Sequence, residues 1–138
     1  MNAVFADTFY WIALTDFADR AHHRALAITA ERATSSIVTT DEVLAEYLTF
    51  FANAHEWMRR EVAKNVRRIL DNEAFRVIPK SRSSFVSGLD LYSARPDKGY
   101  SLTDCISMET MRREGLTGVL TNDRHFEQEG FRALFRES

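Results

Sequence analysis

Two aspartates in the last third of the chain occupy positions where carboxylates often do chemistry. Asp104 follows Ser101 by three residues and falls in the first turn of a predicted helix, and Asp123 comes shortly after the apolar pair Val119 and Leu120. In an α/β fold, helix starts and the carboxyl ends of parallel strands lie along the same edge of the sheet, where ligands bind. We therefore expect the two carboxylates to meet at that edge.

Two further acids fall at the same predicted edge. Asp7 follows the apolar run 3–6 and precedes an apolar helical turn at 9–14, so it lies between a buried strand and a helix. Glu46 lies about one and a half turns into a helix that opens at Thr40, beside a stripe of apolar residues. An acid flanked by apolar residues is harder to explain as a cap than an acid at a helix end.

Each acid also has an ordinary structural interpretation, which stays open at this point. Ser101 and Asp104 match a capping box, and Asp7 and Asp123 can each cap the helix that follows them. Glu46 can be a solvated side chain. The functional interpretation gains weight because four acids are predicted at one edge.

Four carboxylates at one edge repel one another and raise one another's pKa values unless a cation is present. Hard oxygen ligands, without thiolates or a pair of histidines, favour Mg²⁺, with Mn²⁺ as a substitute, over zinc. The natural reaction is phosphodiester hydrolysis, in which the metal activates water and stabilises charge on the leaving oxygen. The sequence has no glycine-rich phosphate loop, G-x-S-x-G elbow or H-E-x-x-H motif that would favour another chemistry.

Short apolar strands alternate with helical patterns along the chain, which is typical of an α/β domain with a parallel sheet. Strand signals fall at 3–6, 35–39, 75–78, 119–120 and 131–135. Helical patterns cover 16–32, 54–70, 81–92 and 101–114, and another helix opens at residue 40.

Two finer expectations concern the orientation of side chains. In the helix at 81–92 the large apolar residues are expected to face the core; they are Phe85, Val86, Leu89 and Tyr92. Thr39 and Glu42 have the spacing of a capping box for the helix that opens at residue 40.

The helix at 54–70 has one apolar side and one basic side. Four basic residues share a face at helical spacing: Arg60, Lys64, Arg67 and Arg68. They predict a stripe that contacts phosphates of a nucleic acid. The alternative is a solvated face, partly paired with Glu56 and Glu61.

Length and composition predict one ordinary soluble domain spanning residues 1–138. The 138 residues are 45% hydrophobic and 28% charged, enough for a real core. The net charge of −2 does not favour nucleic-acid binding overall, but it leaves a local basic patch open. The single cysteine, Cys105, fits a reducing, cytoplasmic setting. The apolar stretch at 9–14 is too short to span a membrane and lacks a basic leader, so we expect no signal peptide and no membrane segment.

Four segments in order carry a resemblance to a known family. They are Asp7-Thr8, Val43-Leu-Ala-Glu46, Ser101-Leu-Thr-Asp104-Cys105 and Leu120-Thr-Asn-Asp123-Arg-His-Phe126. Together they resemble a PIN-domain nuclease, and most of all the VapC-type ribonuclease toxins of prokaryotic type II toxin–antitoxin pairs. The resemblance covers essentially the whole chain, and the last two motifs are its specific part.

The resemblance implies a single PIN-like α/β domain with a central parallel sheet of four to five strands flanked by helices. It implies Asp7 and Asp104 as metal ligands, with Glu46 and Asp123 binding directly or through water and Asp123 the least critical. Small hydroxyl residues next to the acids match supporting positions behind them; these are Thr8, Thr103 and Thr121.

The implied activity is Mg²⁺-dependent endonucleolytic hydrolysis of RNA, which inhibits translation by cutting a structured RNA such as tRNA or ribosomal RNA. The implied partners are a small antitoxin that docks near the active site and a second copy of the chain, in the cytoplasm and without a membrane. Two alternatives stay open. One is a non-catalytic RNA- or protein-binding PIN-like module, and the other is a phosphohydrolase of small phosphoesters, against which the basic helix argues mildly.

Overall fold

A five-stranded parallel sheet forms the centre of the molecule in the computed structural model, which describes residues 3–32 and 35–137. The strand order is β3-β2-β1-β4-β5, which puts the first strand in the middle. The strands are β1 (Val4–Ala6), β2 (Ile37–Thr40), β3 (Phe75–Ile78), β4 (Gly118–Leu120) and β5 (Arg132–Ala133). The expected α/β fold with a central parallel sheet is confirmed.

The three central strands are buried along their whole length, which explains why they read as continuous apolar runs. In the middle strand, Phe5 pairs with Val38 of β2 and with Val119 of β4. Because these strands are parallel and in register, their carboxyl ends open onto one edge of the sheet.

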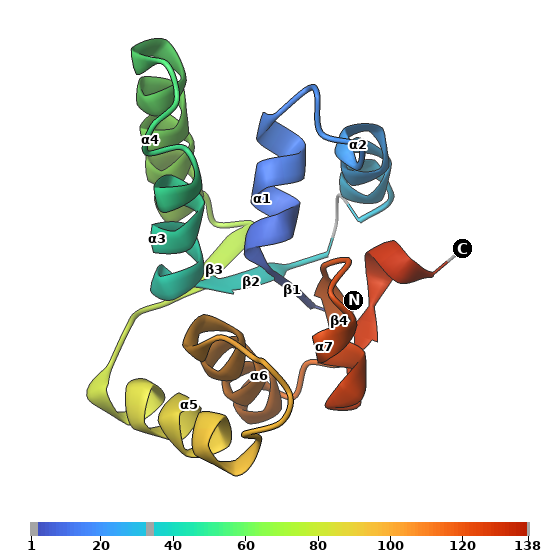
Figure 1. Ribbon diagram of the computed structural model, residues 1–138. Coiled ribbons are helices and arrows are strands. Elements are labelled where there is room, and N and C mark those ends of the chain that lie inside the picture. Colours follow the sequence, from blue (N-terminus) through green and yellow to red (C-terminus); the bar gives the residue numbers. More distant parts are fainter. Residues whose placement is uncertain (1–2, 33–34, 138) are drawn as a thin grey trace.

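Helices cover both faces of the sheet. They are α1 (Thr8–Thr15), α2 (His22–Glu31), α3 (Asp41–Phe50), α4 (Glu56–Asp71), α5 (Arg82–Ala94), α6 (Leu102–Glu114) and α7 (Arg124–Gln128), and a 3-10 turn at Leu134–Arg136 follows β5. In Figure 1, α1 to α4 lie on one side of the strands and α5 and α6 on the other. None of the helices described has the length and apolar character needed to cross a membrane.

Local signals at both ends fix the position of α6, the helix that carries Asp104. The Ser101 hydroxyl accepts from the Asp104 N–H at 3.0 Å, and the Asp104 carboxylate accepts from the Ser101 N–H at 3.2 Å. At the other end Gly115 adopts a left-handed conformation with φ of 71°, which glycine reaches without the penalty of a Cβ. The capping box predicted from the sequence is therefore formed.

The second helix begins later than the expected range 16–32, at His22. The carboxylates of Asp16 and Asp19 each accept a hydrogen bond from the backbone N–H two residues further on, at 2.9 and 2.8 Å. Such side-chain bonds offer the backbone an alternative to the helix, so the segment forms turns instead.

The capping box expected of Thr39 and Glu42 is wrong by one residue. Strand β2 extends through Thr40, whose hydroxyl caps α3 by accepting from the Val43 N–H at 3.1 Å. The Thr39 hydroxyl is buried and donates to the Ala6 carbonyl at 2.9 Å, so it ties β2 to β1.

The closing strand is also shorter than the expected range 131–135. After β5 the chain turns into the 3-10 helix, and the Phe135 N–H donates to the Thr121 carbonyl at 3.2 Å. This bond draws the end of the chain toward the loop that follows β4.

The predicted orientation of α5 is wrong, because its large apolar residues face outward. Each is at least 40% exposed: Phe85, Val86, Leu89 and Tyr92. The buried face consists of Ser84, Gly88 and Leu91. A Cβ on Gly88 would lie 2.4 Å from Cγ1 and 3.1 Å from the backbone N of Ile106 in α6. The two helices approach so closely that small residues, rather than large ones, form their contact.

Candidate active site

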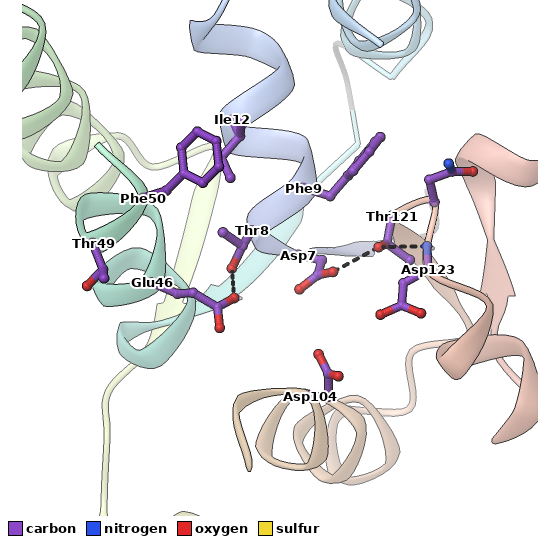
Figure 2. A pocket seen from close by; sticks show the side chains of 11 residues that line it. Asp7, Thr8, Phe9, Ile12, Glu46, Thr49, Phe50, Asp104, Thr121 and Asp123 are labelled. Carbon is purple, nitrogen blue, oxygen red and sulfur yellow. Dashed lines mark hydrogen bonds between the residues drawn. The ribbon is translucent and has the colours of Figure 1, made fainter. Parts of the chain in front are cut away.

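A cavity of about 580 Å³ opens at the carboxyl ends of β1 and β4, and all four predicted acids line it (Figure 2). Asp7 follows β1, Glu46 comes from α3, Asp104 from the first turn of α6, and Asp123 from the loop after β4. The lining residues that the structure describes include no lysine or arginine. The carboxylates thus share a cavity without a protein cation in its wall.

Asp7 is the most deeply buried of the four acids, with 7% of its surface exposed. It occupies the N-cap position of α1 but makes no capping hydrogen bond. Its carboxylate instead accepts from the Thr121 hydroxyl at 2.8 Å, across from the loop after β4. The capping interpretation of Asp7 therefore does not explain its orientation.

Burial raises the pKa of Asp7 to about 7, and the nearby charges of Asp104 and Glu46 act in the same direction. The Thr121 hydroxyl and the backbone N–H of Thr8 oppose this rise, because they stabilise the charged form. Without a cation, the folded protein thus disfavours an ionised Asp7. A bound cation would reverse that preference.

Glu46 enters the cavity from the α3 side, where Thr8 holds it (Figure 2). The buried Thr8 hydroxyl donates to Oε1 of Glu46 at 2.5 Å. Thr8 belongs to the first turn of α1, one residue after Asp7. The adjacent residues Asp7 and Thr8 therefore supply one acid of the cavity and the hydroxyl group that orients Glu46.

Asp104 both caps its own helix and faces the cavity. Its side chain is 16% exposed. Burial raises the pKa of Asp104, as do the charges of Asp123 and Glu46, while hydrogen bonding at Ser101 and the neighbouring His125 lower it. The capping and functional interpretations are compatible for this residue.

Asp123 also combines the two roles. Its carboxylate caps α7 by accepting from the His125 N–H at 2.9 Å. Its own N–H donates to the Thr121 hydroxyl at 3.2 Å. Thr121, which is fully buried, therefore links the Asp123 backbone to the Asp7 carboxylate.

His125 lies beside Asp104 and Asp123, although no role was predicted for it from the sequence. Its Nδ1 lies 3.4 Å from Oδ1 of Asp123 and 3.8 Å from Oδ2 of Asp104. The three side chains form a group with the ligand types and spacing to hold a metal ion. The available signal was a histidine, a common metal ligand, two residues after a candidate acid.

Thr103, predicted as a supporting hydroxyl group, does not line the cavity. Thr103 is half-buried in the first turn of α6, and its hydroxyl makes no hydrogen bond with the part of the chain that is described.

The basic residues predicted to contact RNA are exposed on α4 and do not line the cavity. Arg60 pairs with Glu56 at 2.6 Å and Lys64 with Glu61 at 3.6 Å. Further along the same face lie Arg67 and Arg68. These ion pairs match the alternative of a partly paired, solvated face, and RNA contact by this stripe stays a prediction.

The donor set fits a divalent metal ion. Figure 2 shows the carboxylates of Asp7, Asp104 and Asp123 pointing toward one another. The buried Nδ1 of His125, which lies near Asp104 and Asp123, has no hydrogen-bond partner among the described residues. Oxygen ligands with an imidazole nitrogen suit divalent cations. A cation would also compensate the mutual repulsion that raises the pKa values of Asp7 and Asp104.

Comparisons with known proteins agree with this geometry. The sequence profile of the PIN domain family matches residues 4–131. VapC20 of Mycobacterium tuberculosis, a sarcin-ricin loop cleaving toxin, has a similar structure with a TM-score of 0.83 and 23% identity, over 93% of this chain and 95% of that one.

Two more distant structures are DNA-bound VapBC assemblies. VapBC2 of Rickettsia felis gives a TM-score of 0.65 at 13% identity, over 95% of this chain and 96% of that one. VapBC of Salmonella typhimurium gives 0.64 at 14% identity, over 96% of this chain and 97% of that one. Comparison with curated protein sequences gave no match.

Proposed function

The chain belongs to the PIN domain family, and from this premise we propose that it is a metal-dependent endoribonuclease, the toxin of a toxin–antitoxin pair. The observation that carries the proposal is the cavity lined by Asp7, Glu46, Asp104 and Asp123, in whose described wall no lysine or arginine balances the charge. The similarity to a toxin that cleaves the sarcin-ricin loop supports a structured RNA as the substrate.

Asp7 and Asp104 hold the metal in this proposal, and Glu46 and Asp123 reach it directly or through water. The ion is Mg²⁺, for which Mn²⁺ substitutes. When bound, it supplies charge stabilisation at the scissile phosphate and lowers the pKa of a bound water.

The hydroxyl groups around the acids set the orientation of the carboxylates. Thr121 holds one oxygen of Asp7, and Thr8 holds Oε1 of Glu46. Oε2 of Glu46 has no hydrogen-bond partner within the described chain, so this atom is free to accept a proton from the attacking water. The apolar lining from Phe9 and Ile12 limits the water around these groups.

RNA reaches the cavity, we propose, along the basic face of α4 that carries Arg60, Lys64 and Arg67. Replacing these three with alanine should weaken RNA binding and lower the slope of affinity against salt by about one for each lost phosphate contact. An unchanged salt slope would exclude this face and favour a small phosphoester substrate.

The partners we propose are a small antitoxin and a second copy of the chain. The similarity to VapBC assemblies supports the antitoxin. The rim of the acid-lined cavity includes Phe50, which is 59% exposed, so the site suits a segment that combines apolar and basic side chains.

The outward apolar face of α5 suits a second copy of the chain. Its members are Phe85, Val86, Leu89 and Tyr92. Light scattering should give the mass of a dimer for the wild type and of a monomer for Leu89→Glu, because a charge in an apolar contact is costly. We propose that this assembly acts in the cytoplasm, where its RNA substrate lies.

The test of activity uses protein purified free of antitoxin and incubated with total RNA, in Mg²⁺ or in EDTA. Wild type should give discrete fragments only with the metal, and Asp104→Asn should lower cleavage at least about a hundredfold. Asparagine keeps an oxygen that accepts from the Ser101 N–H, so the helix cap survives. Asp97→Asn, in the exposed loop after α5, is the matched control and should cut like the wild type.

Cleavage by Asp104→Asn at the wild-type rate would overturn the proposal. Intact RNA in every lane, with folded protein that still binds RNA in EDTA, would favour the non-catalytic binding module instead.

A further inference from the structure

We propose that His125 is a nitrogen ligand of the metal site, together with Asp104 and Asp123, and that it raises the affinity for Mn²⁺ relative to that for Mg²⁺. The inference rests on the proposed function, because it concerns the same metal. It adds a residue and a selectivity that the four acids alone do not provide.

The distances suit three ligands that share one ion. Nδ1 of His125 lies 3.4 Å from Oδ1 of Asp123 and 3.8 Å from Oδ2 of Asp104. One ligand atom from each residue lies within 4.8 Å of the other two. Ligand atoms that each lie about 2.1 Å from one ion are about 3.0–3.5 Å from one another, so the pair formed by His125 and Asp123 already has this spacing and the other pairs must move closer when the ion binds.

The Nδ1 atom of His125 is buried and has no hydrogen-bond partner among the described residues. Buried polar atoms are nearly always paired, so an unpaired one calls for an explanation. A hydrogen bond to Asp104 or Asp123 would satisfy the atom, but neither contact has hydrogen-bond geometry. In the tautomer with an unprotonated Nδ1, a cation between this nitrogen and the two carboxylates would satisfy all three groups.

Other contacts hold the imidazole without using Nδ1. The backbone N–H of His125 donates to the Asp123 carboxylate at 2.9 Å. The ring packs edge-to-face on Tyr100, with centroids 5.1 Å apart. The Tyr100 hydroxyl in turn donates to Glu129 at 2.9 Å. The ring is therefore fixed in place, and its inner nitrogen stays free for a ligand.

A nitrogen ligand changes the affinity of the site for one metal relative to another. Mg²⁺ binds oxygen ligands and gives up its waters reluctantly, whereas imidazole is a ligand of transition metals. Carboxylates bind Mg²⁺ and Mn²⁺ alike, so the difference between these ions comes from His125. Losing it should lower the affinity for Mn²⁺ more than the affinity for Mg²⁺.

The direct test is pulsed electron paramagnetic resonance of Mn²⁺ bound to the full chain, which detects nitrogen coordinated to the metal. The protein is prepared with natural histidine and with ¹⁵N-histidine. The variants are His125→Gln, Asp104→Asn and His23→Gln, an exposed histidine on α2 that serves as the matched control. Circular dichroism checks that each variant is folded.

We expect a nitrogen signal in the wild type and in His23→Gln that changes with ¹⁵N-histidine and is lost in His125→Gln. Calorimetry should show Mn²⁺ affinity lowered at least about tenfold in His125→Gln, the size that even outer-shell partners of a metal contribute. The affinity for Mg²⁺ should change by less than about threefold.

Failure of this inference is distinguishable from failure of the proposed nuclease. Mn²⁺ binding that requires Asp104 but shows no histidine nitrogen would overturn the role of His125 and leave the nuclease intact. Mn²⁺ binding unaffected by Asp104→Asn, or none in the wild type, would overturn the metal site itself. If His125→Gln does not fold, the ¹⁵N-histidine comparison in the wild type alone still decides.

Discussion

Asp7 and Glu129 both have carboxylates with little exposure to solvent, and the folded protein has opposite effects on their charges. Asp7 is 7% exposed, and the Glu129 side chain is 4% exposed. Burial raises the pKa of Asp7 to about 7, and the charges of Asp104 and Glu46 add to that effect. In the cavity, the charge of Asp7 therefore has neighbours of the same sign.

Glu129 follows α7 and lies in a cluster of opposite charge. Arg112 donates to it at 2.6 Å, and Arg95 and the Tyr100 hydroxyl each donate at 2.9 Å. Burial alone would raise the pKa of Glu129, but these hydrogen bonds outweigh it and lower the pKa to about 2.

The difference separates a carboxylate that stabilises the fold from one that belongs to the proposed metal site. Glu129 is paired with the guanidinium groups of Arg95 and Arg112, so its charge stabilises the fold. Asp7 has no such partner in the described cavity wall, and its ionised form is costly until a cation arrives. Burial by itself therefore does not identify a site, whereas burial without a counter-charge does.

The largest expected effect follows from the pKa of Asp7. A carboxyl group whose folded pKa lies above its unfolded value of 3.8 destabilises the folded state progressively as pH rises from about 4 to about 7. In EDTA, the free energy of unfolding should therefore fall by up to roughly 4 kcal/mol across this range. Asp7→Asn should remove most of that fall, and urea unfolding between pH 4 and 8 measures it.

Glu129 does not affect this measurement above about pH 4.5. The stabilisation by its ionised carboxylate is complete there and is lost only as the pH falls from about 4.5 to about 2. Asp90→Asn serves as the control with an exposed aspartate. If Asp7→Asn shows the same fall as the wild type, Asp7 is not the uncompensated charge that the comparison requires.

The next effect is stabilisation by metal. Mg²⁺ or Mn²⁺ at about a hundred times its dissociation constant should raise the free energy of unfolding by about 2.7 kcal/mol. Thermal melts at pH 7.5 should therefore shift upward by several degrees in the wild type and by much less in Asp104→Asn. A wild-type melting temperature that does not change in millimolar Mg²⁺ or Mn²⁺ would argue against a site in which the four carboxylates bind one metal.

Glu129→Gln tests the other side of the comparison. It should lower the free energy of unfolding by roughly 1–3 kcal/mol, because Arg95 and Arg112 lose a charged partner. Glu137→Gln removes an exposed pair with Arg132 and should change stability little. The two variants are compared by urea unfolding at pH 7, and equal losses would mean that burial of Glu129 contributes nothing.

The smallest expected effect is that of Thr121→Val. The variant removes the hydroxyl that bonds Asp7 and should cost about 1 kcal/mol. Since that bond lowers the pKa of Asp7, its loss should move the end of the stability fall to higher pH. Thr117→Val, at an exposed position just before β4, is the control, and an unmoved pH profile would show that Thr121 does not tune Asp7.

Local signals explain how much of the site could be predicted. The capping box of Ser101 and Asp104 needs only residues three apart, and it forms as expected. Asp7 and Asp123 were placed by the apolar runs that precede them. These signals require no knowledge of the partner strand, because they arise from the backbone at each end of an element.

The periodicity of apolar residues in α5 led to a wrong prediction of which face of this helix is buried. Its apolar residues repeat at helical spacing, and the spacing is the same for a core face and for a face that meets another molecule. The orientation of α5 is set by the close contact between Gly88 and Ile106, because the face of α5 that meets α6 has no room for a side chain at position 88. Only the packed helix pair reveals this requirement.

The sequence by itself determined the parallel α/β sheet and the position of three acids, Asp7, Asp104 and Asp123, at the ends of its elements, because buried runs and helix caps depend on neighbouring residues. The tertiary structure decided the partners of the acids: Thr121 for Asp7, Thr8 for Glu46, and His125 beside Asp104. These pairs join segments up to 114 positions apart. No local pattern specifies such a contact, since it depends on how the strands are ordered and how closely the helices pack.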